Sequence, residues 1–192
     1  MARVTRIVSV LAVVLVGCAG SPSEETAESI AADPPVVLSA TALPRMTSVA
    51  SSVDVDDLTN EVTHPDELRA MLGEAGFASA AQRSFGGGTG AFARVLARGL
   101  SFATETGAAA FVRWIGDHAP EEIVTAERIF PAGVPEGAAV FRHEPDGCCH
   151  NDVPAFVAAW RRGSSVLFLH AGGPRATTEA FVQLITSYDE EV

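Results

Sequence analysis

The stretch of sequence that decides the fold is Ala155–His170, AFVAAWRRGSSVLFLH. Two apolar runs flank Arg162-Gly163, and a glycine between two such runs is typical of a tight turn. Successive side chains of a strand point to opposite faces of a sheet. One face therefore carries Val166, Phe168 and His170, and the other carries Leu167 and Leu169. The stretch predicts an antiparallel hairpin of two strands, residues 155–161 and 164–170.

Similar patterns on both sides of this hairpin predict the remaining elements. Alternation and turn residues predict the strands, and caps, apolar spacing and a terminal glycine predict the helices. The expected order is α-β-β-α-β-β-β-β-α, with most neighbouring strands joined as hairpins. This order favours an α+β fold, a two-layer sandwich in which helices pack on one face of a mostly antiparallel sheet. The expected strands are 78–85, 91–103 (with a bulge at Gly99), 123–130 and 138–144; the expected helices start at Thr63 and end at Gly76, start at Thr104 or Thr106 and end before Pro120, and start near 174–177.

Composition limits the size and the partners of the protein. The 192 residues are 47% hydrophobic and 19% charged, which is enough apolar material for one domain with a core. Thirteen Lys and Arg against 24 Asp and Glu give a formal net charge of -11. Because affinity for nucleic acids comes largely from cationic side chains, this charge argues against a nucleic-acid partner.

The N-terminus has the pattern of a secretory signal. Arg3 and Arg6 precede the apolar run Val10–Val16, which is too short to span a bilayer. The end of this run and the two residues after it, Leu15-Val16-Gly17-Cys18, resemble the lipobox of bacterial lipoproteins. That resemblance implies removal of residues 1–17, lipidation of Cys18 and anchoring at the outer face of the cytoplasmic membrane. Two or more acyl chains on one residue hold a protein stably at a membrane.

Residues 18–62 are predicted to form a disordered acidic tether, and residues 63–192 a single α+β domain. The tether region contains one cation, Arg45, and no aromatic residue, so it has little apolar surface to offset the entropy of ordering. Two alternatives are an edge strand at Val36–Leu38 and local packing of Asp54–Val62. This layout is similar to small lipid-anchored extracytoplasmic domains of actinobacteria, including sensor-like domains of receptor kinases. The similarity is one of element order and transfers no functional residue.

One loop, His143–Asp152, gathers two histidines, two cysteines and three carboxylates. Cys148 and Cys149 could close a vicinal disulfide, which would be strained because neighbouring Cα atoms lie only about 3.8 Å apart. Alternatively, the two thiolates with His150 and His143 could bind Zn or Cu(I). The third alternative is a polar loop whose cysteines have no such role.

No other motif predicts catalysis. The loop Gly86–Gly90 has the glycines of a phosphate-binding loop but lacks its Gly-Lys-Ser/Thr ending. His118 and His170 have no partner motif, so both are expected to be structural, and Trp114 and Trp160 fit core positions. The sequence therefore predicts no enzyme and no cofactor. It favours a binding, sensing or interaction module for a small molecule, an envelope component or a protein, with a metal-binding or redox protein as the alternative.

Overall fold

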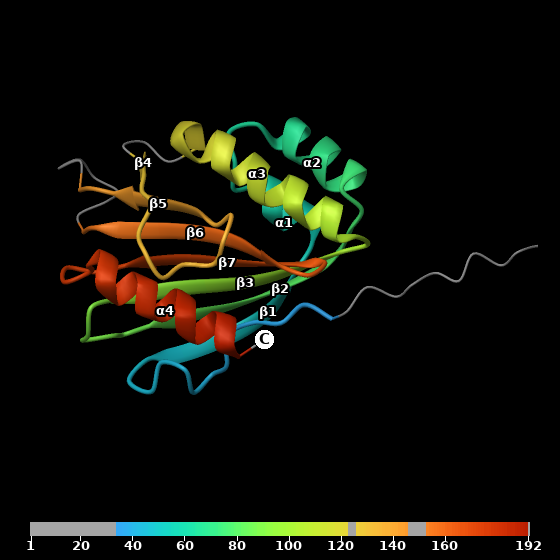
Figure 1. Ribbon diagram of the computed structural model, residues 1–192. Helices are drawn as coiled ribbons and strands as arrows, with labels where there is room; N and C mark the ends of the chain where they lie inside the picture. The colour runs from blue at the N-terminus through green and yellow to red at the C-terminus, as the bar shows by residue number, and fades with distance from the viewer. Residues whose placement is uncertain (1–33, 123–125, 146–152, 192) are drawn as a thin grey trace, which may run out of the picture.

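The computed structural model describes residues 34–122, 126–145 and 153–191. These residues form one seven-stranded antiparallel sheet with the strand order β1-β2-β3-β7-β6-β5-β4, and four helices pack against it (Figure 1). The strands are β1 (Thr47–Val53), β2 (Phe77–Gly86), β3 (Arg94–Phe102), β4 (Ala126–Arg128), β5 (Ala139–His143), β6 (Ala155–Arg162) and β7 (Ser165–Gly172). The helices are α1 (Val55–Thr59), α2 (Pro65–Glu74), α3 (Glu105–Glu122) and α4 (Thr178–Glu190). The α+β class and the antiparallel sheet are confirmed.

The hairpin predicted for residues 155–170 lies at the middle of the sheet. β6 and β7 pair antiparallel with Trp160 opposite Leu167, and Gly163 in the turn has a φ of +60°. β7 then pairs with β3, which joins this hairpin to the β2–β3 hairpin. The central strands are buried on both sides, as is every residue from Ala155 to Trp160.

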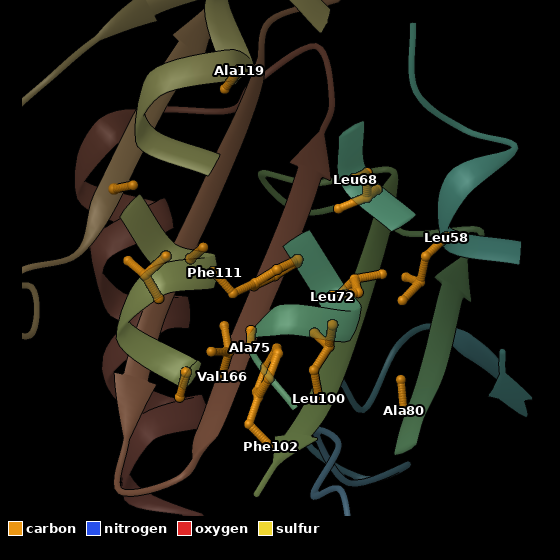
Figure 2. Close-up of a cluster of buried hydrophobic side chains, with 14 of the residues drawn as sticks. Leu58, Leu68, Leu72, Ala75, Ala80, Leu100, Phe102, Phe111, Ala119 and Val166 are labelled. Atoms are coloured by element: carbon orange, nitrogen blue, oxygen red, sulfur yellow. The ribbon is translucent and has the colours of Figure 1, made fainter. Parts of the chain in front are cut away.

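Helices cover both faces of the sheet, because central strands that are apolar on both faces need cover on each side. α1, α2 and α3 lie on one face and α4 on the other, so the expected single helical face holds for three of the four helices. Figure 2 shows side chains of α1, α2 and α3 converging on β3 and β7. The core on the α3 face includes Leu68, Leu72, Leu100, Phe102, Phe111 and Val166; that on the α4 face includes Leu38, Phe156, Trp160, Leu167, Phe181 and Tyr188.

The prediction of a disordered tether over residues 18–62 is wrong for residues 34–62, so the domain does not begin at residue 63. β1 pairs with β2 along its whole length, and Leu38 is completely buried. Asp54 caps α1 through a capping box, so the alternative of local packing at Asp54–Val62 is confirmed. Val36–Leu38 is not a strand. The prediction of disorder from composition is wrong for this segment because a few apolar residues, each packed on a distant element, are enough to order it.

The start of the described chain is tied to its end, which lies beside it in Figure 1. The backbone N–H of Ser39 donates to Glu191 at 2.8 Å, and the Tyr188 hydroxyl donates to the carbonyl of Val36 at 2.9 Å. Burial raises the pKa of Tyr188 well above its usual value, which keeps this hydroxyl a donor. All described strands, helices and core clusters lie within residues 34–191. A chain of residues 19–192 therefore contains the whole described fold.

Several local predictions differ from the structure. The strand expected at 123–130 is reduced to β4, and residues 129 and 130 lie outside it. The first helix has its N-cap at His64 rather than Thr63, while Gly76 ends it with a φ of +70°, as expected. The second predicted helix starts after Thr104, as expected, but it continues through Pro120.

Gly99 makes no bulge, since its register with both neighbouring strands is continuous. A Cβ at Gly99 would lie 2.0 Å from the carbonyl oxygen of residue 36, so this glycine allows the N-terminal segment to cross the sheet closely.

Candidate functional site

A pocket of about 220 Å³ lies on the α3 face of the sheet. β3, β6 and β7 form its floor, α3 forms one wall, and α1, α2 and the turn between them form the other. The apolar lining residues are Leu58, Val62, Leu68, Leu100, Phe111, Trp114, Ile115, Ala119, Val157 and Phe168, and the polar ones are Glu61, Arg98 and His170. An apolar cavity with a few convergent polar groups is the usual form of a small-molecule site.

Arg98 is the buried polar group of this pocket, with 8% of its surface exposed. Its Nε donates to the Gln82 side chain at 2.8 Å, and its guanidinium carbon lies 6.0 Å from the centre of the Phe168 ring. Its Nη2 donates to a carboxylate oxygen of Glu61 at 2.7 Å. Buried charges are normally paired in this way, because an unpaired charge in an apolar environment is costly.

His170 lies on β7 opposite Leu96, two residue pairs from Arg98 on the same face of the sheet, and the residue is exposed. Partial burial lowers the pKa of His170 below its ordinary value of 6.5, and His143, Arg98 and Arg94 lower it further, against a smaller opposing effect of Glu61. Neutral imidazole is therefore the favoured form at neutral pH. Two arginines, Arg94 and Arg98, and one carboxylate, that of Glu61, act on this ring, although the whole chain has a formal net charge of -11.

The wall formed by α3 presents an aromatic surface to the pocket. The rings of Trp114 and His118 are stacked, with centroids 4.5 Å apart and planes at 13°. His118 Nδ1 is 3.0 Å from the backbone oxygen of Trp114, and His118 Nε2 is 3.8 Å from a carboxylate oxygen of Glu67 on α2. These contacts fix the orientation of the indole, which is half-buried rather than a full core residue.

The two tryptophans lie on opposite faces of the sheet. Trp160 is completely buried on the α4 face, and its Nε1 donates to Asp189 at 2.9 Å. Trp114 lines the pocket on the α3 face. The chain contains these two tryptophans and no other, so their indole signals report separately on the two faces.

Of the five residues predicted as lipidation, disulfide or metal sites, the structure places one, His143. His143 lies at the end of β5, buried at 3% exposure, on the same face as His170. Cys18, Cys148, Cys149 and His150 lie outside the described residues. Within the described ranges, no three His, Cys, Asp or Glu side chains are grouped as metal ligands. His143 thus lies on the sheet face that carries the pocket without lining the pocket, and the cysteine alternatives stay open.

Sequence reasoning missed the two residues that give the pocket its charge, Arg98 and Glu61. A signal for Arg98 was present, since Arg94, Leu96, Arg98 and Leu100 alternate with small residues and so share one face of a largely apolar strand. Glu61 carried no such signal, because it lies in the segment expected to be a tether. For His170 and Trp114 the sequence predicts structural roles, whereas the structure places both at the pocket.

Comparisons with known proteins give a distant structural similarity. No protein-family model and no curated protein sequence matches the chain. Among solved structures, the chain is similar to "Crystal structure of the extracellular domain of PknH from Mycobacterium tuberculosis", with 14% sequence identity and a TM-score of 0.46, over 83% of this chain and 82% of that one. In the part of the chain that the structure describes, no helix has the length and apolarity needed to cross a bilayer.

Proposed function

We propose that the protein is a lipid-anchored extracytoplasmic module that binds a small, largely apolar molecule in the pocket between α3 and the sheet. The observation that carries this proposal is the pocket itself, in which a nearly buried arginine, Arg98, lies among apolar side chains. An aliphatic side chain in place of Arg98 would fill this space without the cost of taking a charge out of water. An arginine kept in an open apolar pocket instead suits recognition of a ligand.

The location is proposed from the N-terminal sequence. Arg3, Arg6 and the run Val10–Val16 support export, and Leu15-Val16-Gly17-Cys18 supports lipidation at Cys18. Replacement of Cys18 by serine is expected to abolish labelling of the protein by radioactive palmitate in a bacterial host and to release the chain from the membrane fraction. Unchanged membrane fractionation of Cys18→Ser would refute the lipid anchor without bearing on the pocket.

The pocket is tested by titrating residues 19–192 with octanol while recording the two indole N–H signals by NMR. Octanol is expected to shift the Trp114 signal, because this indole lines the pocket, and to leave the Trp160 signal in place. Ala119→Leu places a larger side chain in the pocket and is expected to abolish the shift. Ala109→Leu makes the same change on α3 outside the pocket and is the matched control.

A different pattern of shifts would contradict the proposal. If neither indole moves at millimolar octanol, the cavity does not accept apolar molecules. If both indoles move equally, or if Ala119→Leu binds octanol as well as Ala109→Leu does, the probe binds elsewhere.

A further inference from the structure

The contacts of Arg98 give the pocket a defined chemical preference. We propose that the ligand is a small amphiphile whose carboxylate head pairs with Arg98 in place of Glu61, while a short apolar tail occupies the rest of the pocket. This inference rests on the proposed function, since it names the ligand class of the same site. Three observations support it: the Arg98–Glu61 ion pair has one exposed partner, the charges beside Arg98 favour an anion, and the pocket is small.

Arg98 is fixed, whereas its carboxylate partner is exposed. The sheet holds Arg98 through Gln82 on β2 and Phe168 on β7, and its side chain is 10% exposed. The Glu61 side chain is 52% exposed and lies in the turn between α1 and α2. Glu61 can therefore rotate into water at low cost, and a carboxylate from a ligand can take over its bond to Arg98.

The charge around this end of the pocket selects an anion. Arg94 and Arg98 lie on the same face of β3, and both act on His170 as positive charges, with Glu61 as the opposing negative charge. When a ligand carboxylate replaces Glu61, the buried guanidinium keeps a negative partner and the displaced carboxylate gains full hydration. A cationic head in the place of the Glu61 carboxylate would instead face the Arg98 guanidinium and would be repelled.

The remaining space fits a short tail. Leu100 follows Arg98 by two residues on β3 and points to the same face, so the apolar part of the pocket begins beside the guanidinium. The volume of about 220 Å³ lies below the roughly 300–1,000 Å³ of sites for drug-sized ligands. An eight-carbon chain is therefore a suitable probe.

The test compares octanoate, octanol and octylammonium as ligands of residues 19–192 at pH 7.5, with the Trp114 indole signal as the readout and that of Trp160 as the internal reference. Octanoate is expected to bind at least tenfold more tightly than either of the other two. Glu61→Gln removes the competing carboxylate and is expected to tighten octanoate binding about tenfold. Glu105→Gln is the matched control, because Glu105 pairs with Arg161 at 2.8 Å outside the pocket.

Arg98→Gln adds a second variant, which is expected to bind octanoate no better than octanol. Equal binding of octanoate and octanol by the unmodified chain would overturn the carboxylate preference and leave the proposed function standing. Tightest binding of octylammonium, lost in Glu61→Gln, would overturn it in favour of a cationic ligand. If no probe shifts the Trp114 signal, both this inference and the proposed function fail.

Discussion

Replacement of Leu38 by alanine tests whether the segment before β1 belongs to the folded domain. Leu38 is completely buried in the α4-face core, in a region whose composition predicts disorder. Its carbonyl accepts a hydrogen bond from Arg83 Nε at 3.0 Å, and this bond survives the substitution because it involves the backbone. The change therefore removes apolar packing and little else.

The expected loss of stability follows from this burial. Truncation of a fully buried leucine to alanine costs about 2–5 kcal/mol, of which part is lost transfer energy and part is the cavity left behind. We expect about 3 kcal/mol for Leu38→Ala, which for a chain of this size corresponds to a decrease in Tm of roughly 6–12 °C. Urea unfolding of residues 19–192, followed by far-UV circular dichroism, measures the free energy of unfolding. Leu38→Ala is expected to lower the urea concentration at the midpoint of unfolding and to leave unchanged the slope of the free energy of unfolding against urea concentration.

The matched control is Val36→Ala, two residues earlier, where the side chain is 37% exposed. Its cost is expected to stay below about 1 kcal/mol, since partly exposed side chains lose less on truncation. If Leu38→Ala costs less than about 0.5 kcal/mol, or no more than Val36→Ala, the segment is not docked as described and the domain does not include it.

Three further predictions concern glycine positions, a histidine and the cysteine pair. Gly99→Ala is expected to lower the free energy of unfolding by more than about 2 kcal/mol in the same urea assay, because its Cβ would meet the backbone of residue 36. Gly73→Ala in α2 is the control: its Cβ has open space, and the free energy of unfolding is expected to rise by up to about 1 kcal/mol. Equal effects of the two substitutions would refute the close crossing at Gly99. Because burial and neighbouring charges lower the pKa of His170, the unfolded state binds its proton more strongly, so the free energy of unfolding should fall as the pH decreases from 6.5 through the folded-state pKa. His170→Asn is expected to remove the share of this pH dependence that comes from His170. If the free energy of unfolding of the variant falls with pH as steeply as that of the unmodified chain, the prediction is wrong. Protein exported to an oxidising compartment is expected to contain a Cys148–Cys149 disulfide, seen as a mass lower by about two hydrogen atoms and resistance to alkylation; a metal adduct lost on denaturation, with both thiols then alkylated, would favour the metal alternative instead.

Much of the fold could be predicted from the sequence because its signals are local. The turn at Gly163, the cap at Thr177 and the positive φ at Gly76 each depend on a few neighbouring residues. The arrangement of layers was harder to predict. Alternation gives two sets of side chains for each strand, but only the packed structure shows that α4 covers one set and α1–α3 the other.

The candidate site could not be predicted in the same way, because its residues come from separate parts of the chain. Arg98 and Glu61 are 37 residues apart, and no local pattern links them. His170 and Trp114 were visible in the sequence, yet neither had a partner motif that indicated a shared pocket. The His143–Asp152 loop is unusual in its residue types, but type alone does not show what surrounds a side chain.

By itself, the sequence determined the α+β class, the central hairpin at residues 155–170 and the secretory pattern of the N-terminus, since each depends on residue type and spacing along the chain. Only the tertiary structure decided that residues 34–62 belong to the domain and that Arg98 lies in an apolar pocket opposite Glu61. The physical reason is that burial and charge pairing are properties of contacts between distant segments. Leu38 is ordered by the sheet and helix it packs against, and a single leucine in a polar segment carries no record of those partners.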